Sequence, residues 1–411
     1  MSSIILVSAH IEDCPEAVPL GAASVAAALR QAFPHISIQL LETFTSIESA
    51  ASENAASFVK KIQKTLTAGT IAIGFSVYSW NRALMLHAAR ILRAAHPQLF
   101  FFCGGPEVTA LPEGLIAAEG GAFDAVIRGD GEIEAVRVLG EVLCTPRSGA
   151  RQPKSAGGAV SVQPCRIDSL ESLPSPWLDG TLDIGEHAVL WELSRGCPYA
   201  CAYCYESKGA QGGKRVRYMS DERIRAELAL FLQKKAPYVF VLDPTFNSDN
   251  ERALNILDLI YSQTAASGAG THWHFEVRSE LLNRRQAHGF AKIGASVQIG
   301  LQTANPKAAA LIGRGGFDSG FDAAKFRAKI NLLNDAGVTF GLDLIYGLPG
   351  DTLDDYKKSV DYALSLYPNN LDMFRLSVLP GTALWDNAAE LGLNACADSL
   401  RNNFHKRFFC R

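Results

Sequence analysis

Apolar and polar positions in the first part of the chain switch repeatedly between two periods. Short β-branched runs, typical of buried strands, alternate with Ala-rich segments whose apolar spacing is typical of helices. The predicted strands are Ile4–Ser8, Ile36–Leu41, Ile71–Phe75, Leu99–Cys103 and Ala125–Ile127, and the predicted helices include Leu20–Ala32, Ala50–Thr67 and Ala83–Ala95. This order predicts an α/β domain over residues 1–144 with a flavodoxin-like or Rossmann-like doubly wound sheet.

A second series of strands and helices follows from about residue 187. Its predicted strands are Val189–Leu193, Tyr238–Leu242, His272–Val277, Val297–Gly300, Thr339–Ile345 and Met373–Val378, with helices such as Asp221–Lys235 and Leu353–Ser365 between them. Six such units predict a partial (β/α)6 barrel over residues 187–385 instead of a closed barrel of eight strands. Pro, Gly and Ser accumulate within residues 145–186, which predicts a linker, with a surface loop inside one domain as the alternative. Residues 386–411 are expected to form a C-terminal tail.

Composition and charge narrow the class of protein. The chain has 411 residues, of which 48% are hydrophobic and 20% charged, as in ordinary globular proteins. The net charge of -3 provides no basic field for a nucleic acid or an anionic membrane, so neither is expected as a partner. No apolar run is long enough to span a membrane and the start lacks a signal-peptide pattern, so a cytoplasmic location is expected. Nine cysteines are too few for a disulfide scaffold in a chain of this length.

Three of the cysteines lie close together directly after the first predicted barrel strand. Cys197, Cys201 and Cys204 have the spacing C-x-x-x-C-x-x-C, which lets one loop supply three thiolates to a cubic iron–sulfur cluster. Three thiolates leave one of the four irons open to a small molecule. A zinc site is the competing interpretation, but it needs a fourth Cys or His at short spacing, and the residues that follow supply none. Chance spacing is the remaining alternative.

The cysteine loop resembles the signature of the radical S-adenosylmethionine (radical SAM) superfamily. The resemblance includes Tyr203, an aromatic residue directly before the third cysteine. It implies that Cys197, Cys201 and Cys204 hold a [4Fe-4S] cluster whose open iron binds SAM. It also implies that the reduced cluster cleaves SAM to a 5'-deoxyadenosyl radical, with electrons from an external low-potential donor of flavodoxin or ferredoxin type.

Further polar residues follow the ends of the predicted barrel strands, where this fold places its chemistry. A carboxylate at Asp243 suits the SAM ammonium, and Arg314 suits its carboxylate. His272 and His274 receive no proton-transfer role, because alternating histidines on a strand are more often structural. The residues that the resemblance implies as SAM contacts are Asp243, Thr245, Glu276, Arg278, Gln302, Arg314 and Ile345.

The first domain concentrates small and polar residues after its strands, where doubly wound folds bind ligands. Glycines there let a bulky planar ligand approach the backbone, and the lack of a G-x-G-x-x-G motif disfavours a dinucleotide. This arrangement resembles the cobalamin-binding domain that precedes the barrel in one class of radical SAM enzymes. The motif D-x-H-x-x-G is absent, which implies cobalamin without a lower His ligand. The implied contacts are Ser76, Tyr78, Gly104, Gly105, Glu107, Gly129, Gly131 and Glu132. A fold that has lost the cofactor is the alternative.

The two resemblances together imply an enzyme. Its cofactors are a [4Fe-4S] cluster, SAM and cobalamin, and its reaction is methylation of an unactivated carbon of a small molecule or natural-product intermediate. SAM then serves both as the methyl source for cobalamin and as the radical precursor. The first alternative is a radical SAM enzyme that carries out rearrangement, cyclisation or other hydrogen-abstraction chemistry without cobalamin. The second is a sensor or assembly partner without enzymatic activity.

Overall fold

The computed structural model describes residues 2–11, 14, 17–44, 51–110, 121–144, 160–161, 165–185, 188–208, 216–314 and 321–393. The chain separates into two compact units, unit 1 up to Asp183 and unit 2 from Ile184 onward. Residues 145–159, 162–164 and 186 of the predicted linker, and residues 394–411 of the predicted tail, lie outside the described residues. The predicted domain boundaries stay predictions. Within the described ranges, every helix falls short of the length and apolar character needed to span a bilayer.

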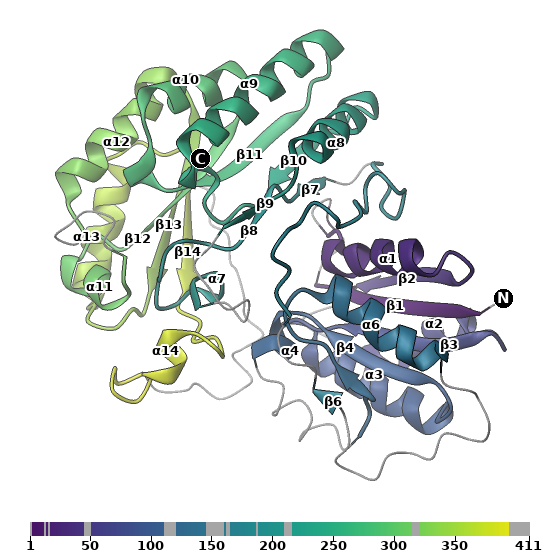
Figure 1. The fold of residues 1–411 in the computed structure, drawn as a ribbon. Coiled ribbons are helices and arrows are strands. Elements are labelled where there is room, and N and C mark those ends of the chain that lie inside the picture. The colour runs from purple at the N-terminus through teal and green to yellow at the C-terminus, as the bar shows by residue number, and fades with distance from the viewer. Residues whose placement is uncertain are drawn as a thin grey trace. The chain divides into compact units, whose positions relative to one another are not determined.

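Unit 1 contains a parallel sheet in the order β2-β1-β3-β4-β5-β6. Figure 1 shows helices α1 and α6 on one face of this sheet and α2 and α3 on the other. The strands are β1 (Ser3–His10), β2 (Ser37–Phe44), β3 (Thr70–Ser76), β4 (Phe100–Gly104), β5 (Ala125–Val126) and β6 (Val160–Ser161). The helices are α1 (Leu20–Ala32), α2 (Ala51–Thr65), α3 (Arg82–Ala95), α4 (Pro106–Ala110) and α6 (Gly131–Cys144). The predicted doubly wound fold is therefore confirmed.

Two separate apolar clusters explain why the strands of unit 1 read as continuous hydrophobic runs. One cluster joins the sheet to α2 and α3, and the other joins it to α1 and α6. Strand β1 is buried from Ser3 to Ala9 because both of its faces are covered by helices. The strand order reverses between β1 and β3, and in this fold type a ligand binds beyond the carboxyl ends of the strands at that point.

Described residues of the predicted linker pack onto unit 1. Strand β6 extends the sheet beside β5, and Cys165 forms a β-bridge with Gly129. The carboxylate of Asp130 accepts a hydrogen bond of 2.8 Å from the backbone N–H of Ile167. These contacts attach the segment to the loop that follows β5.

Unit 2 contains a second parallel sheet, in which the strands follow one another in chain order from β7 to β14. Its strands are β7 (Val189–Trp191), β10 (Tyr238–Val241), β11 (His272–Val277), β12 (Ser296–Gln302), β13 (Thr339–Tyr346) and β14 (Asn370–Arg375). The first and last of these strands are not paired with each other, so the described sheet is open. The predicted partial barrel is confirmed. A short antiparallel pair, β8 (Ser194–Arg195) and β9 (Arg217–Tyr218), lies beside the cysteine loop and was not expected.

The helices of unit 2 lie between successive strands and have well-formed ends. They are α7 (Tyr205–Lys208), α8 (Asp221–Gln233), α9 (Asn250–Ser267), α10 (Arg284–Lys292), α11 (Pro306–Leu311), α12 (Ala323–Ala336), α13 (Leu353–Leu364) and α14 (Ala383–Asp386). Ser220, Asp249 and Thr352 cap α8, α9 and α13 through their side-chain oxygens. Strand β14 begins three residues before its predicted start at Met373, because the polar residues that open it point to the interior face of the sheet instead of marking a turn.

Alternate residues of the unit 2 strands face opposite sides of the sheet. One side is apolar and packs on the helices: Trp191 contacts Phe231 of α8, and Phe275 contacts Phe290 of α10. We call the other side the inner face. Its residues on β11 to β14 are His272, His274, Glu276, Ser296, Gln298, Gly300, Gly341, Asp343, Ile345, Asn370 and Asp372.

Candidate functional site

The cysteine loop lies against the end of α11 and the start of α14. Cys197 and Cys201 are buried and Cys204 is half-buried. The backbone N–H of Ala202 donates to the carbonyl of Ile312, and its carbonyl accepts from the N–H of Leu384. These backbone contacts fix the middle of the loop, so the predicted cluster cysteines occupy a defined loop conformation.

Asp243 holds the backbone that leads into this loop. One carboxylate oxygen accepts from the backbone N–H groups of Leu193 and Ser194, each at 2.9 Å, and the other accepts from the Ser194 hydroxyl at 2.6 Å. Burial raises the pKa of Asp243 to about 6, although these three hydrogen bonds act in the opposite direction. The structure thus places this predicted SAM contact with both oxygens bonded to the loop.

Two arginines approach the sulfur of Cys201. Arg278 Nη1 lies 3.7 Å and Arg314 Nη1 3.9 Å from Cys201 Sγ. Arg278 is buried, forms an ion pair with Glu280 and lies over the ring of Tyr199 at 3.6 Å from its centroid. The positive charge of Arg278 lowers the pKa of Glu280 against the opposing effect of burial. Cationic donors of this kind stabilise a thiolate, which is the form of cysteine that binds metal.

Thr245 and Gln302 also lie at the ends of their strands. The hydroxyl of Thr245 is 3.7 Å from Cys197 Sγ and donates to the carbonyl of Pro244 at 2.8 Å. Gln302 has a φ of 68°, a left-handed conformation that side chains other than glycine rarely adopt. Its Oε1 atom is buried, and none of the described residues donates a hydrogen bond to it. A buried acceptor without a donor is costly, so Gln302 fits a ligand that donates an N–H or O–H group.

The third cysteine is supported by packing. Tyr203, beside it, packs with Ile312, Ile345 and Leu348, so the predicted SAM contact Ile345 lies in the same apolar cluster. Burial raises the pKa of the Tyr203 hydroxyl, so it stays neutral. This cluster connects the cysteine loop with α11 and with the end of β13.

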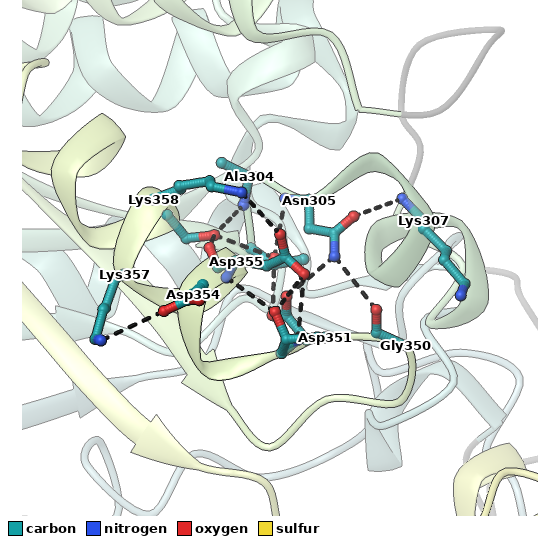
Figure 2. Close-up of polar contacts among 12 residues, drawn as sticks. Ala304, Asn305, Lys307, Gly350, Asp351, Asp354, Asp355, Lys357 and Lys358 are labelled. Atoms are coloured by element: carbon teal, nitrogen blue, oxygen red, sulfur yellow. Dashed lines mark hydrogen bonds and ion pairs between the residues drawn. The ribbon is translucent and has the colours of Figure 1, made fainter.

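Helix α11 is itself fixed by a polar network, shown in Figure 2. Asn305 caps the helix through the N–H of Lys307 and donates to Asp351 at 3.1 Å and to the carbonyl of Gly350 at 3.3 Å. Ala304 N–H donates to the hydroxyl of Ser359 at 2.9 Å. The loops after β12 and β13 are therefore tied together behind the cysteine loop.

The donor set of the loop fits an iron–sulfur cube better than a single metal ion. Among the residues that the structure describes, no three Cys, His, Asp or Glu side chains converge closely enough to hold one ion. Thiolates that bind three different corners of a cube do not need to converge on a point. The unpartnered Gln302 Oε1 and the two arginines beside Cys201 add a polar environment for a ligand at the remaining corner.

The carboxyl edge of the unit 1 sheet is built largely from close backbone contacts. Gly105 has a φ of 116°, and a Cβ there would lie 3.1 Å from the backbone nitrogen of Val77. Gly129 has a φ of 79°, and a Cβ there would lie 3.0 Å from the backbone nitrogen of Cys165. Gly104 ends β4 beside Ile127. Gly105 and Gly129 require glycine because adjoining loops pass directly over them, whereas a Cβ at Gly104 would make only ordinary contacts.

Polar side chains complete this edge. Buried Asn81 donates to the carbonyls of Ala9 and Ser76 and accepts from the N–H of Tyr78 at 2.8 Å. Glu107 is buried and forms an ion pair with Arg82 at 3.0 Å. The ends of β1 and β3 are thereby joined where the strand order reverses.

The remaining predicted contacts of unit 1 lie on the same edge. The ring of Tyr78 stacks on that of Trp80 with 4.4 Å between centroids, and Trp80 is 44% exposed. Gly131 and Glu132 begin α6, where Gly131 faces Val25 of α1 and Glu132 is buried. An exposed aromatic stack beside glycine-lined loops is a surface that suits a large, flat ligand.

Sequence reasoning missed several residues that shape these sites. Ser194, Tyr199 and Asn81 act through contacts between segments far apart in the chain, and no motif marks them. Gln298, Asn370 and Asp372 lie on the inner face of unit 2. Polar residues at every second position of β12 and β14 were the available signal, because alternation in a buried strand indicates a polar interior.

Comparison with known proteins identifies both units. Residues 191–363 match the radical SAM superfamily, and residues 14–139 match the B12 binding domain. Unit 2 is thus a radical SAM domain. The chain contains a B12-binding domain followed by a radical SAM domain, and the predicted combination of these two domains is confirmed. The prediction of a [4Fe-4S] cluster, SAM and cobalamin as cofactors is confirmed at the level of these domain classes.

Curated relatives of the chain are named as methyltransferases or as a methylase. The chain is 29% identical over 318 residues to the uncharacterized methyltransferase PH0819 of Pyrococcus horikoshii, covering 73% of this chain and 65% of that protein. It is 28% identical to the hopanoid C-3 methylase of Methylococcus capsulatus, covering 65% of this chain and 49% of the relative. With the cobalamin-dependent radical SAM methyltransferase TokK of Streptomyces tokunonensis the identity is 27%, covering 42% and 27%. The chain thus spans 65% or less of the length of these relatives.

A solved structure shows the same fold. The radical SAM methyltransferase TsrM from Kitasatospora setae, with tryptophan and a SAM analog bound, matches with a TM-score of 0.68. The match covers 95% of this chain and 76% of TsrM at 16% identity. At this identity the likeness supports the fold and says nothing of the substrate.

Proposed function

We propose that the protein is a cobalamin-dependent radical SAM methyltransferase that methylates an unactivated carbon of a small molecule. The observation that carries the proposal is the union, in one chain, of a three-cysteine radical SAM domain with a B12-binding domain. Relatives of the chain are named as methyltransferases, one of them as a cobalamin-dependent radical SAM methyltransferase. When bound, cobalamin supplies a methyl group, and the cluster with SAM supplies the radical that activates the carbon.

In this proposal each part of unit 2 has a distinct task. Cys197, Cys201 and Cys204 hold the cluster, and Asp243 holds the loop that carries them. Arg278 and Arg314 stabilise the Cys201 thiolate. Arg314 is also proposed to pair with the SAM carboxylate. Thr245, Glu276, Gln302 and Ile345 complete the proposed SAM site, and Gln302 offers its unpartnered Oε1 as an acceptor.

In unit 1 the proposed cobalamin contacts lie along the carboxyl edge of the sheet. Gly104, Gly105, Gly129 and Gly131 are proposed to contact the ligand through their backbone, and Tyr78 offers an aromatic face. Ser76, Glu107 and Glu132 are the proposed polar contacts. No histidine in a D-x-H-x-x-G motif is available, so the proposal places no histidine below the corrin.

The partners in this proposal are a small-molecule substrate and an external low-potential electron donor. A flavodoxin or ferredoxin would supply the electron that the cluster needs. The overall acidic charge of the chain, -3, favours neither a nucleic acid nor an anionic lipid surface as a partner.

A single-turnover experiment tests the proposal without knowledge of the substrate. The protein is purified anaerobically with cobalamin, its cluster is reconstituted, and SAM is added under strong reduction. We expect corrinoid and cluster absorption at stoichiometric levels, with methylcobalamin and S-adenosylhomocysteine as products. Formation of 5'-deoxyadenosine alone, without bound corrinoid, would instead establish the cobalamin-independent alternative. The wild-type protein should also form 5'-deoxyadenosine, and the matched control is a Cys201→Ala variant, which should retain corrinoid but make no 5'-deoxyadenosine.

A further inference from the structure

The inner face of unit 2 contains two carboxylates that the chemistry proposed so far does not use, Asp343 and Asp372, beside the proposed SAM contact Glu276. Parallel register places Glu276 beside Gln298, and places Asp343 of β13 beside Asp372 of β14. All of these side chains lie at alternate strand positions and therefore on the inner face, which faces away from the helices. Three acidic residues from three strands therefore share one interior surface.

A glutamine side chain fixes two of these carboxylates in place. Gln298 Nε2 donates to Asp343 Oδ1 and to Asp372 Oδ2, the second at 3.2 Å. The side chain crosses over Gly341, where a Cβ would lie 2.9 Å from Gln298 Cδ. Gly341 thus leaves the space through which Gln298 reaches from β12 to β14. Asn370 Nδ2 adds a further hydrogen bond of 2.8 Å to Asp372 Oδ2.

This arrangement leaves acceptors without donors. Asp372 is 8% exposed, and its Oδ1 atom is buried without a hydrogen-bond partner among the residues described. The buried Oδ1 of Asn370, two residues before it, likewise receives no hydrogen bond from any described residue. Both amide hydrogens of Gln298 Nε2 are already used by the two carboxylates. Buried acceptors of this kind are rare in folded proteins and indicate a missing donor.

The charges on this face are also unbalanced. In the described parts of β7 and β10 to β14, no Lys or Arg belongs to the inner face. One cation reaches it from outside these strands: Arg314 donates to the carbonyl of Gly300, so a single guanidinium faces three carboxylates. Burial, together with the charges of Glu276 and Asp372, raises the pKa of Asp343 to about 7, while Arg314 acts against the shift. Burial also raises the pKa of Glu276, although its side chain remains accessible. His272 and His274, the other titratable groups on this face, each lie within hydrogen-bond distance of Ser296. A cation bound here would compensate the carboxylates.

We propose that Asp343 and Asp372 bind a positively charged, N–H-donating group of the substrate, such as an amine or amidine. The inference deepens the proposed function, because it assumes that a small-molecule substrate enters unit 2. The opposite part of the inner face is apolar, where Leu190 pairs in register with Phe240 and the Phe240 ring lies 5.2 Å from that of His274. The ligand class is therefore a cation joined to an apolar or aromatic body.

A matched pair of small probes tests this assignment on the cluster- and cobalamin-loaded protein. Benzylamine and benzyl alcohol differ in their charged and neutral polar groups, and their binding is measured by ligand-observed NMR without turnover. We expect benzylamine to bind at least tenfold more tightly than benzyl alcohol. We expect Asp372→Asn and Asp343→Asn each to weaken benzylamine binding at least tenfold, and Asp361→Asn, on the exposed side of α13, to leave it unchanged.

Three outcomes would overturn the proposal: equal binding of the two probes, undetectable binding of benzylamine, or unchanged binding in both carboxylate variants. SAM is itself cationic, so SAM affinity is measured on the same proteins. A loss of SAM affinity as large as the loss of benzylamine affinity would assign the carboxylates to the cofactor and would also overturn it. Retained cluster absorption in each variant shows that it is folded. Because no turnover is needed, failure of methyl transfer would leave this measurement interpretable.

Discussion

The two candidate binding regions, the carboxyl edge of the unit 1 sheet and the interior of unit 2, differ in what shapes them. The carboxyl edge of unit 1 is shaped by glycines under tight backbone contacts, and its buried polar groups, such as Asn81 and Glu107, have partners within the unit. The interior of unit 2 is lined by side chains that leave acceptors without donors and carboxylates with raised pKa values. Among the described residues, the buried polar atoms without a hydrogen bond at the edge of unit 1 are nitrogens, His10 Nε2 and Arg128 Nε, whereas those of the unit 2 interior are oxygens, on Gln302, Asn370 and Asp372, that a donating ligand would satisfy. Changes of shape should therefore damage unit 1, and changes of charge should damage unit 2.

Loss of a cysteine ligand should give the largest effect. Cys201→Ala removes the buried thiolate that two arginines approach, so we expect iron content after reconstitution to fall at least about tenfold and SAM cleavage to disappear. Iron and sulfide assays with electron paramagnetic resonance of the reduced protein measure this. Cys144→Ala, which removes an exposed thiol of unit 1, is the control and should behave as wild type. A Cys201→Ala protein with a full cluster signal would contradict the ligand assignment.

A shape change at the edge of unit 1 should come next. Gly105→Ala introduces a Cβ against the backbone of Val77 at a φ of 116°, so we expect unit 1 to lose about 1–3 kcal/mol of stability. Cobalamin binding should weaken with it, as measured by equilibrium dialysis. Gly121→Ala is the matched control, since Gly121 also has a positive φ (92°) but a Cβ there would have no atom within 4 Å. Equal losses in both variants would mean that backbone strain alone, and not close approach, matters at position 105.

A smaller effect is expected where a carboxylate holds the cysteine loop. Asp243→Asn removes the charged acceptor of the N–H groups of Leu193 and Ser194 and puts an amide nitrogen where Oδ2 accepts from the Ser194 hydroxyl, so we expect a loss of about 1–3 kcal/mol in stability and incomplete cluster loading. Ser194→Ala removes one of the three hydrogen bonds and should cost less. Denaturation curves and iron content of the two variants measure the ranking. If the Asp243→Asn variant kept its stability and its iron content but lost SAM affinity, Asp243 would be a direct cofactor contact, as its position after the strand predicts.

The sequence was sufficient to predict the bounds of helices and strands whose apolar periodicity lies within one continuous segment. Helix α1 and strand β11 have their predicted bounds, because continuous periodicity and flanking turn residues define them. Strand β6 was missed because two residues cannot display a period, and its pairing with β5 supplies the only signal. The start of β14 was misplaced because Asn and Asp are common in turns, and the sequence does not show that Asn370 and Asp372 lie on the inner face of the sheet.

The same limit applies to the site. Spacing alone identified the three cysteines, since one loop carries all of them. Asp243 was singled out as a SAM contact because it follows a predicted strand, but the sequence does not show that its carboxylate accepts from residues about fifty positions earlier. The role of Gly341 depends on a glutamine from the preceding strand that passes over it. Contacts of this kind arise only when strands are set side by side.

The smallest predicted effect is a pH dependence of the stability of unit 2, caused by the titration of Asp343 in its interior. The folded pKa of Asp343, about 7, is above its unfolded value of about 3.9. Between these values the folded chain binds a proton that the unfolded chain has lost, so this residue makes stability fall as pH rises from about 4 to about 7. Asp343→Asn removes the titration, and we expect its stability relative to wild type to increase by at least about 1.4 kcal/mol, the equivalent of one pKa unit, from pH 5 to pH 8.

Chemical denaturation of wild type and variant at pH 5 and pH 8 measures this difference. Asp361→Asn, an exposed carboxylate on α13, is the matched control and should follow wild type at both pH values. Adding benzylamine sharpens the comparison, because a bound cation favours the ionised form of Asp343 and should reduce the fall in stability with rising pH. The carboxyl edge of unit 1 should show no comparable response to this probe. If Asp343→Asn and wild type had the same pH dependence, the carboxylates of the inner face would be ionised at neutral pH, and the contrast drawn between the two units would be lost.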